Sequence, residues 1–525
     1  MIQSTSIAVI TSEEPLMTDL PLVSTTLSLA SVLAEPAWRT PETVALVQGP
    51  RRLTYAETWN EARKVAAALV EDGVEPGDRV ALLAPNVVEF VTSYYGILAA
   101  GGVVVPVPTL LQGREAAFLI ATAGASRLLY HPAVASTANQ GAELAGVPLH
   151  DITTYGAATE PLASFVTREP MDPAVIFFTS GTTGKPKGAV LTHLNLVMNA
   201  TVSAFDGNGV ADDAVILGCL PLFHIFGQSV SLNAGFRRSS TLVLQPRFEP
   251  REAIDLMNAE GVTMICAVPT MYIQLLAAVA ENPDLNVPHL DDAISGGASL
   301  PVAVLERFEK TFSTRIHEGY GLSETSPSIT SNQERFGVVP GSVGHPLWGV
   351  DVDIADLTVP ERISLVGPGE RGEVVVRGHA VFAGYWNNAE ASAEALTDGW
   401  FRTGDIGIKD ATGRTTIVDR TKDLVIRGGY NVYPREVEEA LMRYDGVAQV
   451  AVIGVPHEEY GEEIMAVVVP TEAGAVDADA LVEWSRDELG KHKYPRRVQI
   501  VEQLPLGPSM KVLKRELRTQ YSDNA

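Results

Sequence analysis

The sequence predicts an α/β protein in which a large N-terminal body of several subdomains carries a small, mobile α+β lid. Its 525 residues exceed what one compact core holds, since domains of about 100–200 residues are typical. From Thr54 onward, strand patterns alternate with helical periodicity, which is typical of mostly parallel sheets covered by helices. Beyond Arg420 a separate compact pattern begins. We therefore expect a disordered leader at 1–22, a body at 23–420 and the lid at 421–525.

The first elements of the body follow from hydrophobic periodicity. Trp59, Ala62 and Val65 fall on one face of a predicted helix at 55–70. The elements expected after it are a strand at 79–84, a helix at 87–100 and strands at 103–107 and 127–130. The same alternation returns as a strand at 241–244, a helix at 251–260, a strand at 263–267 and a helix at 301–311.

The pattern of predicted elements changes in the second half of the chain. Between Gly341 and Arg420, short strand patterns at 372–378 and 414–420 lie between Gly, Asp and Asn turns, which indicates a small β-rich subdomain. Pro434 then opens a helix whose acidic residues occupy the first turn, where the helix dipole favours them. The remaining elements expected in the lid are strands at 447–455 and 463–469, a helix near 477–489, a strand at 497–501 and a basic, solvated tail.

The charge excludes several classes of partner. The formal net charge is −25, whereas nucleic acids and anionic membrane surfaces demand basic patches. We interpret the acidity as a contribution to solubility. No apolar run approaches the roughly 18 residues of a membrane span, so no stable membrane insertion is expected.

The compartment is predicted from the start of the chain and from its cysteines. The first residues lack a basic region and carry Glu13 and Glu14, which makes a poor signal peptide. Cys219 and Cys266 lie in apolar surroundings and are interpreted as buried thiols rather than a disulfide. Both observations favour the cytoplasm. No Cys/His cluster in the sequence suggests a structural metal.

The segment TSGTTGKPKG at 179–188 carries the strongest chemical signal. It follows an apolar strand, its glycines let backbone N–H groups turn toward an anion, and its hydroxyl and lysine side chains add donors and charge. The spacing differs from the P-loop, because two residues rather than four separate Gly181 from Gly184 and Pro186 follows Lys185. We interpret this segment as a phosphate-binding loop of another kind.

Together with five later motifs, this loop resembles the signature of the adenylate-forming ligases, which include acyl-CoA synthetases, peptide-synthetase adenylation domains and luciferases. The five motifs are GGASL at 296–300, YGLSETSP at 320–327, WFRTGDIG at 400–407, DRTKDLVIRGGYNVYPREVE at 419–438 and PLGPSMKVLKREL at 505–517. They occur in the family's order, and the match runs from about Thr54 to the C-terminus.

The resemblance implies a two-step reaction that uses ATP and Mg²⁺. A carboxylate attacks the α-phosphate of ATP, pyrophosphate leaves, and a thiol then displaces AMP from the acyl-adenylate. In this family, the aromatic residue corresponding to Tyr320 stacks on adenine, and the Asp corresponding to Asp405 holds the ribose hydroxyls. Glu324 would be the magnesium ligand, and Thr325 belongs to the same motif. The nucleotide-binding residues implied are Thr179, Ser180, Gly181, Thr182, Thr183, Gly184, Lys187, Gly297, Ala298, Glu318, Gly319, Tyr320, Gly321, Asp405 and Arg420.

Lys511 is the implied catalytic lysine of the first half-reaction. It would bridge the substrate carboxylate and the α-phosphate and neutralise both. We interpret the neighbouring Lys514, Arg515 and Arg518 as merely solvated. The sequence departs from the family here, because Met510 replaces the usual Gly, and Gly507 stands where Thr or Ser is usual. Met510 adds an apolar arm that could narrow the choice of acid.

The resemblance also implies that the lid rotates between the half-reactions. Lys422 would be the hinge, and Gly428 and Gly429 would then let the pantetheine arm of the thiol pass close to the backbone. His224, in the segment PLFHIFGQS at 221–229, could guide the thiol, although a core histidine satisfied by its neighbours is an equal alternative.

The sequence leaves alternatives open for the substrate acid, the thiol acceptor and the oligomeric state. The residues 223–226 read FHIF and offer no Asp for an amino group, which favours an unsubstituted apolar acid, with a fatty acid the leading case. The acceptor is coenzyme A or, as an alternative, the phosphopantetheine of an acyl carrier protein. A paralogue that binds an adenylate without turnover is the alternative of another class. We expect a monomer or a homodimer and no nucleic-acid partner.

Overall fold

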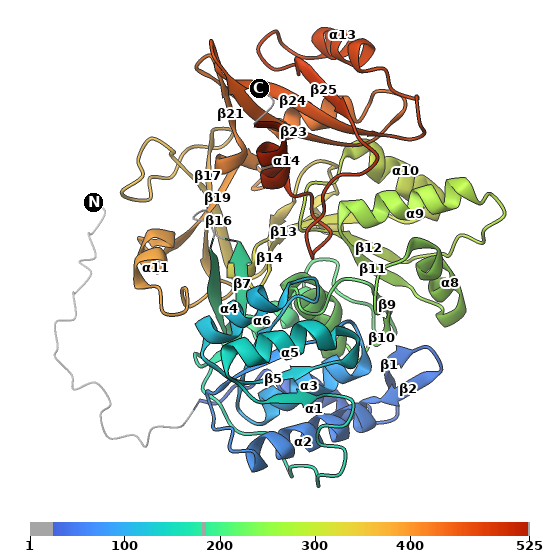
Figure 1. The fold of residues 1–525 in the computed structure, drawn as a ribbon, viewed down its shortest axis with the longest axis vertical. Coiled ribbons are helices and arrows are strands. Elements are labelled where there is room, and N and C mark those ends of the chain that lie inside the picture. The colour runs from blue at the N-terminus through green and yellow to red at the C-terminus, as the bar shows by residue number, and fades with distance from the viewer. Residues whose placement is uncertain (1–24, 181–184, 523–525) are drawn as a thin grey trace, which may run out of the picture.

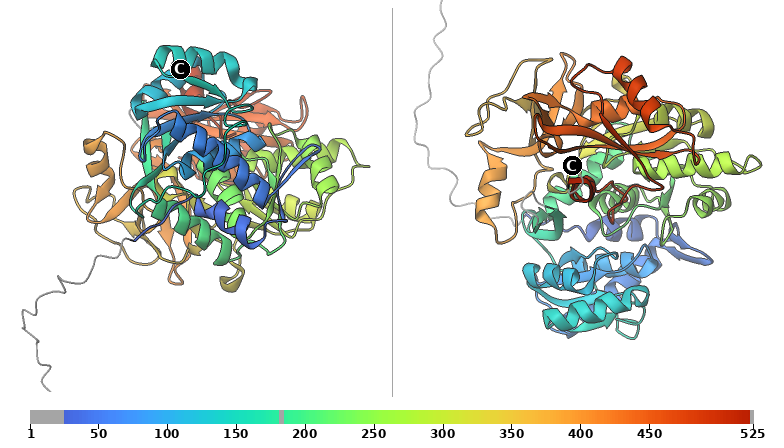
Figure 2. Two further views of the ribbon diagram at one scale, coloured as in Figure 1. Left: turned by 90° about the horizontal axis from the view of Figure 1, so that it is seen from below. Right: turned by 45° about the horizontal axis from the view of Figure 1, so that its top comes forward.

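The computed structural model of the chain describes residues 25–180 and 185–522. The predicted leader lies outside the described residues. The N-terminal elements and the C-terminal elements occupy opposite ends of the long axis (Figures 1 and 2). The mixed α/β fold, with a β-rich subdomain and a C-terminal α+β domain, confirms the predicted fold class.

A six-stranded sheet forms one end of the body. In spatial order its strands are β6 (Leu149–Asp151), β5 (Ala125–Tyr130), β3 (Arg79–Leu83), β4 (Val103–Pro106), β7 (Pro173–Ser180) and β8 (Pro186–Thr192). All neighbours pair in parallel except β7 and β8, which form an antiparallel hairpin. The predicted strands at 79–84, 103–107 and 127–130 are therefore confirmed.

A nine-stranded sheet forms the centre of the body. In spatial order its strands are β15 (His345–Pro346), β14 (Ser328–Ser331), β13 (Ile316–Gly321), β12 (Asp292–Ser295), β11 (Met264–Ala267), β9 (Val215–Gly218), β10 (Thr241–Leu244), β1 (Val44–Gln48) and β2 (Arg51–Thr54). Pairing is parallel from β13 to β1 and antiparallel at both edges. The carboxyl ends of adjacent parallel strands lie at one edge, where open α/β sheets bind ligands.

Helices connect these strands, as the alternating pattern predicts. The α-helices of the body are α1 (Ser31–Arg39), α2 (Tyr55–Glu71), α3 (Val88–Ala99), α4 (Gly113–Ala123), α5 (Ala135–Ala145), α6 (His193–Phe205), α7 (Ala234–Arg237), α8 (Pro250–Glu260), α9 (Pro269–Glu281) and α10 (Val302–Phe312). The body also contains a π-helix, η2 (Gly227–Asn233), and the short 3₁₀ turns η1 (Pro132–Val134), η3 (Ser323–Thr325) and η4 (Glu334–Phe336). Helix α2 begins at a capping box, in which Thr54 accepts from the amide of Glu57 and Glu57 accepts from that of Thr54.

The β-rich subdomain follows as predicted. Its elements are β16 (Val350–Ala355), β17 (Arg371–Gly378), α11 (Ala389–Ala395), β18 (Leu396–Thr397), β19 (Trp400–Lys409) and β20 (Thr415–Arg420). All the ladders of this sheet are antiparallel. It packs against the hairpin of the six-stranded sheet, because residues 383–386 bond to Gly188 and Val190 of β8.

The C-terminal unit forms a sheet of its own. Its elements are η5 (Thr421–Asp423), β21 (Val425–Arg427), β22 (Tyr430–Val432), α12 (Pro434–Leu441), β23 (Val447–His457), β24 (Gly461–Pro470), α13 (Ala478–Glu488), β25 (Arg497–Ile500) and α14 (Lys514–Ser522). The predicted basic tail is therefore a helix. Its buried Leu517 belongs to an apolar cluster with residues of β23 and β24.

The interpretation of the tail as merely solvated is wrong for two of its three basic residues. Lys514 Nζ lies 2.6 Å from Glu438 Oε1, and Arg518 lies 3.0 Å from Asp423 Oδ1. These ion pairs attach α14 to α12 and to η5, because an amphipathic helix presents its basic side chains to nearby carboxylates rather than to water alone.

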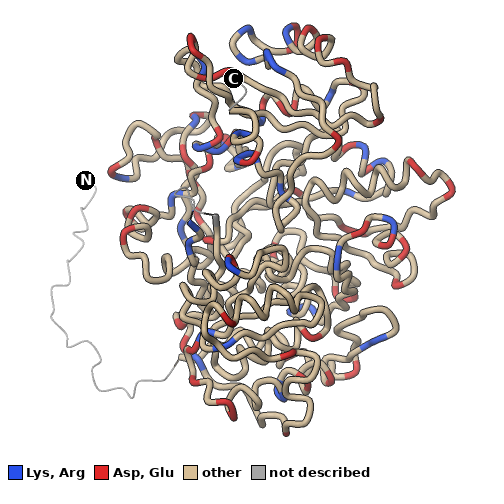
Figure 3. The backbone as a smooth tube through the Cα atoms, viewed as in Figure 1, with Lys and Arg blue, Asp and Glu red and all other residues tan. Residues whose placement is uncertain are grey.

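Cys219 and Cys266 are buried free thiols, as expected. Burial raises the pKa of Cys219 to about 12, so this thiol stays protonated. Acidic and basic residues are interspersed along the chain (Figure 3). Among the described residues, no helix combines the length and the apolar character that crossing a membrane requires.

Candidate functional site

The predicted phosphate loop spans the end of β7 and the start of β8, which pair antiparallel. Thr179 on β7 pairs with Lys187 on β8. The side chain of Ser180, and Gly181, Thr182, Thr183 and Gly184, lie outside the described residues. Lys187 Nζ lies 5.2 Å from the ring centroid of Tyr385, which is within reach of a cation–π interaction.

Glu324 lies beside this hairpin and is almost fully buried, with 7% of its surface exposed. Its Oε1 accepts hydrogen bonds from the hydroxyls of Thr179 and Tyr385, each at 3.0 Å. These two donors orient the carboxylate, and no described residue donates a hydrogen bond to its Oε2. The sequence analysis did not identify Tyr385 as a residue of the site. The sequence marks it only as an aromatic residue after Gly384 in the β-rich region.

The surroundings of Glu324 fit a magnesium ion held mainly by phosphate. Magnesium typically takes one or two carboxylates and completes its shell with phosphate oxygens and water. In the described parts of the chain, no group of three or more His, Cys, Asp or Glu could hold a metal alone. The neighbouring Thr325 hydroxyl is used within its own turn, because it donates to Pro327 O at 2.6 Å.

A second cluster joins Tyr320, Asp405 and Arg420. The Tyr320 hydroxyl donates to Asp405 Oδ2 at 2.6 Å, and Arg420 Nε lies 3.0 Å from Asp405 Oδ1. Asp405 and Arg420 are direct partners in the β19–β20 ladder, and Tyr320 comes from β13 of the central sheet. Asp405 raises the pKa of Arg420, so the guanidinium stays charged. Each oxygen of Asp405 retains a lone pair that could accept a ribose hydroxyl.

Two glycines near this cluster have other atoms packed closely against their backbone. A Cβ on Gly321 would lie 1.7 Å from Pro327 O, and a Cβ on Gly297 would lie 3.0 Å from Lys511 Cε. Gly297 has a φ of +79°, and it and Ala298 lie on an exposed turn after β12. Glycine at 297 and 321 therefore lets other groups approach the backbone closely.

Glu318 and Gly319 are adjacent on β13 but lie in different surroundings. Gly319 lines the cavity described below together with Tyr320. The Glu318 carboxylate instead accepts from the amide of Gly341 at 3.0 Å. Burial raises the pKa of Glu318 to about 7, against the opposing effect of Arg435.

Lys511 enters the site from the lid on a tight hairpin. Gly507 N donates to Lys511 O, and Leu513 N donates to Pro505 O, each at 2.8 Å. The segment before α14 descends from the lid toward β12 and β13 (Figure 1). Thr270 at the start of α9 donates to Met510 O at 2.8 Å and so anchors the hairpin to the body.

Met510 stands at a backbone position that favours glycine. Its φ is +61°, in the left-handed region that residues with a Cβ rarely adopt. This explains the glycine that the family usually has there. The Met510 side chain is partly buried and packs against the largest apolar cluster.

The charge of Lys511 is influenced by three other residues of the site. Burial and the nearby Arg420 lower the pKa of Lys511 to about 8, while Asp405 and Glu324 act in the opposite direction. Lys511 therefore lies close enough to Arg420, Asp405 and Glu324 for their charges to affect its protonation.

His224 lies at the same cavity and is neutral. Burial and the charge of Lys511 lower its pKa to about 3. Its Nδ1 accepts from the amide of Phe226 at 3.3 Å, so the proton resides on Nε2.

The hinge residue Lys422 lies near the second cluster, because burial and the charge of Arg420 lower its pKa while Asp423 and Asp405 act in the opposite direction. Gly428 and Gly429 do not line the cavity described below. Lys422 follows Arg420 in η5, and Gly428 and Gly429 form the turn between β21 and β22, with φ of +55° and +83°. A Cβ on Gly429 would meet no atom within 4 Å. The structure thus brings Lys511, rather than the glycine turn, to the site.

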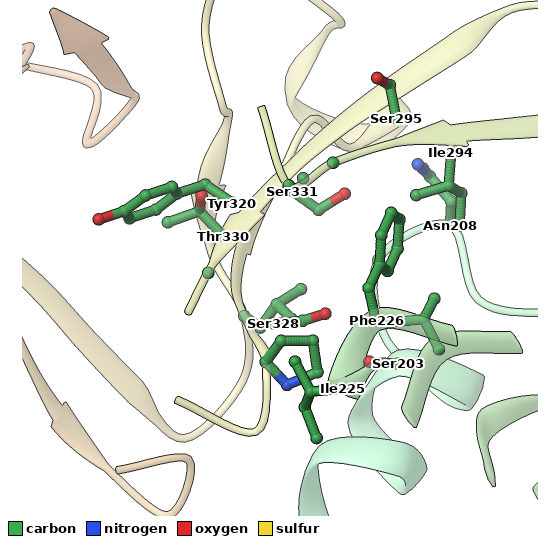
Figure 4. A pocket seen from close by; sticks show the side chains of 18 of the residues that line it. Ser203, Asn208, Ile225, Phe226, Ile294, Ser295, Tyr320, Ser328, Thr330 and Ser331 are labelled. Atoms are coloured by element: carbon green, nitrogen blue, oxygen red, sulfur yellow. The ribbon is translucent and has the colours of Figure 1, made fainter. Parts of the chain in front are cut away.

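Lys511 and His224 line a cavity in the body, and Figure 4 labels other residues of the same lining. Apolar side chains from η2 and the preceding turn, and from β11 and β12, form much of its wall, including Ile225, Phe226 and Ile294. Two described residues of the lining carry a charge, Lys511 and Asp206. Asp206 is already paired, with Arg335 at 3.1 Å and the amide of Trp348 at 3.0 Å.

Comparison with known proteins identifies relatives over nearly the whole chain. Residues 33–386 match the model of the AMP-binding enzyme family, and residues 436–511 match the AMP-binding enzyme C-terminal domain. The chain is 33% identical to a long-chain-fatty-acid–CoA ligase of Bacillus subtilis (strain 168), with 96% of each chain covered. It is 36% identical to a feruloyl-CoA synthase of Amycolatopsis sp, covering 92% of this chain and 96% of that one.

Solved structures show the same fold. The crystal structure of ATP-bound MatB from Rhodopseudomonas palustris matches with a TM-score of 0.86 and 32% identity, over 95% of this chain and 100% of that one. The similarity covers both the body and the C-terminal domain.

Proposed function

The chain belongs to the AMP-binding enzyme family and is an AMP-forming acid–thiol ligase, and we propose that it joins a monocarboxylic acid with an apolar body to coenzyme A. A fatty acid is the simplest member of that class. The relatives are named for different acids, so their names alone do not select one. The observation that carries the proposal is the position of Lys511, which lines a mostly apolar cavity and lies close enough to Glu324 and Asp405 to interact with their charges.

In the first half-reaction, the acid carboxylate would attack the α-phosphate of ATP and pyrophosphate would leave. Asp405 and Arg420 would hold the ribose, and Thr179 and Lys187 would flank the phosphates. Lys511 would bridge the carboxylate and the α-phosphate, whose negative charges otherwise repel each other. Glu324 would hold a magnesium ion through Oε2, and that ion would reduce the charge of the phosphate oxygens.

In the second half-reaction, the thiol sulfur would attack the acyl carbon and the bond to AMP would break. We propose that rotation at Lys422 withdraws Lys511 and brings Gly428 and Gly429 to the site. The ion pairs of Lys514 and Arg518 support movement of the lysine hairpin as part of the lid.

The charge of the cavity supports a single carboxylate on the acid. Lys511 is the one basic side chain among the described residues of the lining. A second carboxylate in the cavity would lie buried without a cationic partner, which costs several kcal/mol.

The test uses the purified full chain with ATP, Mg²⁺ and matched acids of equal length. We expect pyrophosphate release and CoA thioester from octanoate, and a kcat/KM for octanedioate that is lower by roughly 100-fold. Equal activity with the dicarboxylic acid would contradict the assignment of the acid. Acyl transfer to a carrier protein but not to coenzyme A would contradict the assignment of the thiol.

A further inference from the structure

Three serine side chains line the cavity on the side of α6 and β14. They are Ser203 on α6 and Ser328 and Ser331 on β14. The hydroxyls of Ser328 and Ser331 point toward the ring of Phe226 (Figure 4). Part of a mostly apolar cavity is therefore lined with hydroxyl groups.

These three hydroxyls make few hydrogen bonds with the described residues of the protein. In the described parts of the chain, the buried Oγ of Ser203 has no hydrogen-bond partner. Asn199 binds both backbone groups of Ser328, at 2.8 Å to its carbonyl and 3.4 Å to its amide. Among residues 25–180 and 185–522, no hydrogen bond is made by the Ser328 hydroxyl. Ser331 Oγ donates to Asn332 O at 3.2 Å and retains its lone pairs. Because an unpaired buried hydroxyl is costly, a ligand that supplies the missing partner gains that energy.

Other parts of the cavity wall are apolar and closely packed. A Cβ on Gly296 would lie 3.2 Å from Cζ of Phe226, so the ring packs directly on this backbone. Ile225 and Ile294 extend the same surface. The cavity wall thus has apolar parts for hydrocarbon and, at the three serines, a polar face.

The polar face suits neutral atoms rather than charges. Lys511 occupies the reacting end, and Asp206 is neutralised by Arg335. A hydroxyl, ether or carbonyl oxygen can exchange a hydrogen bond with a serine without bringing a charge into the cavity.

We infer that the preferred acid carries a neutral oxygen on its hydrocarbon body, at the edge that faces Ser203, Ser328 and Ser331. The three serines are then specificity-determining residues that distinguish an oxygen-substituted acid from its plain hydrocarbon analogue. This inference rests on the proposed function and specifies the class of its acid.

The test measures kcat/KM for thioester formation with two matched pairs of acids. The pairs are 3-phenylpropanoate with its 4-hydroxy derivative, and octanoate with 8-hydroxyoctanoate. We expect the oxygenated acid to be preferred by about fivefold or more in at least one pair, because each new hydrogen bond is worth about that factor.

Variants of the serines assign the preference to this wall. Ser203→Ala and Ser328→Ala should each lower the ratio of oxygenated to plain acid by about fivefold. Ser136→Ala, on the exposed side of α5, is the matched control and should leave the ratio unchanged. A ratio that neither cavity variant changes overturns the inference.

The two proposals fail in different ways. Thioester formation with a preference for the plain acid in both pairs overturns this inference and leaves the proposed function intact. No thioester from any of the four acids overturns both.

Discussion

Lys511, the lysine that we propose acts in the first half-reaction, has a lowered pKa. Its lowered pKa, about 8, results from burial and from Arg420, against the opposing charges of Asp405 and Glu324. The ammonium form, which predominates below that pH, is the form that can neutralise the carboxylate and the α-phosphate. The activity of the first half-reaction should therefore report the titration of this one side chain.

We expect kcat/KM for adenylate formation to fall above about pH 8, by roughly tenfold for each further pH unit. Lys511→Arg should be slower at neutral pH but should not show this fall, since a guanidinium stays charged throughout the range. The measurement is pyrophosphate release across the pH range for the unmodified protein and for Lys511→Arg. The same decline in both proteins would show that a group other than Lys511 titrates.

Tyr385 is a positioning residue for Glu324. Tyr385→Phe removes one of the two hydrogen bonds to Glu324 Oε1 and keeps the ring beneath Lys187. Hydrogen bonds to charged groups are worth about 1.5–3 kcal/mol, so we expect the Mg²⁺ concentration needed for half-maximal ATP binding to rise by roughly tenfold or more. Calorimetric ATP binding at a series of Mg²⁺ concentrations measures this shift.

Tyr155→Phe provides the matched control for Tyr385→Phe. Tyr155 also donates to a carboxylate, that of Asp72 at 2.7 Å, but in the N-terminal part of the body. Unchanged Mg²⁺ dependence in Tyr385→Phe, or an equal shift in both variants, would refute the positioning role.

Helix α12 connects the lid to the body at two points. Asp419 on β20 accepts from the amide of Arg435 at 3.0 Å, and so serves the start of a helix that belongs to the lid. Glu439 on α12 in turn accepts from the amide of Val302, the first residue of α10, at 3.0 Å. Both contacts place a carboxylate at a helix N-terminus, where the dipole favours it.

Glu439→Ala should loosen the lid in the orientation that places Lys511 at the site. We expect adenylate formation to slow by about three- to tenfold, since a helix cap is worth about 1 kcal/mol. Thioester formation from supplied acyl-AMP should be unchanged or faster. Single-turnover measurements of each half-reaction give the two rates.

Glu436→Ala is the control on the same helix. Glu436 pairs with Lys493 within the lid, at 2.6 Å. If this variant slows adenylate formation as much as Glu439→Ala does, the effect comes from the stability of α12 rather than from the contact with α10.

The molecule as a whole places two functional segments of the lid in different positions. The Lys511 hairpin contacts the body through Thr270 and approaches Gly297, while the turn at Gly428 and Gly429 lies away from the cavity. This arrangement suits the first half-reaction, and the second would require the lid to turn.

Gly429→Leu should impair thioester formation and spare adenylate formation, because its bulk would meet the pantetheine arm only after rotation. Gly474→Leu is the control, since Gly474 lies in another loop of the lid with the same φ of +83° and also has no atom within 4 Å of a Cβ. The backbone strain is therefore similar in both variants. If thioester formation slows equally in Gly429→Leu and Gly474→Leu, the cause is backbone strain rather than obstruction of the pantetheine arm.

The order of helices and strands, the β-rich subdomain and the site motifs could be predicted from local sequence. Periodicity identifies which face of an element is buried, and a motif such as YGLSETSP specifies a short segment whose geometry is local. The alternating elements of the body follow from such patterns. The pairing of β19 with β20, which joins Asp405 to Arg420, was not predicted and is a finding of the structure.

Contacts between distant segments depended on the packing of whole sheets and helices. Tyr385 reaches Glu324 because the β-rich subdomain packs on β8, and the serines of α6 and β14 meet because the helix lies against the central sheet. Glu318 is one residue from Gly319, yet strand alternation directs it toward Gly341. A sequence pattern states which side of an element a residue occupies, and only tertiary packing determines what lies opposite that side.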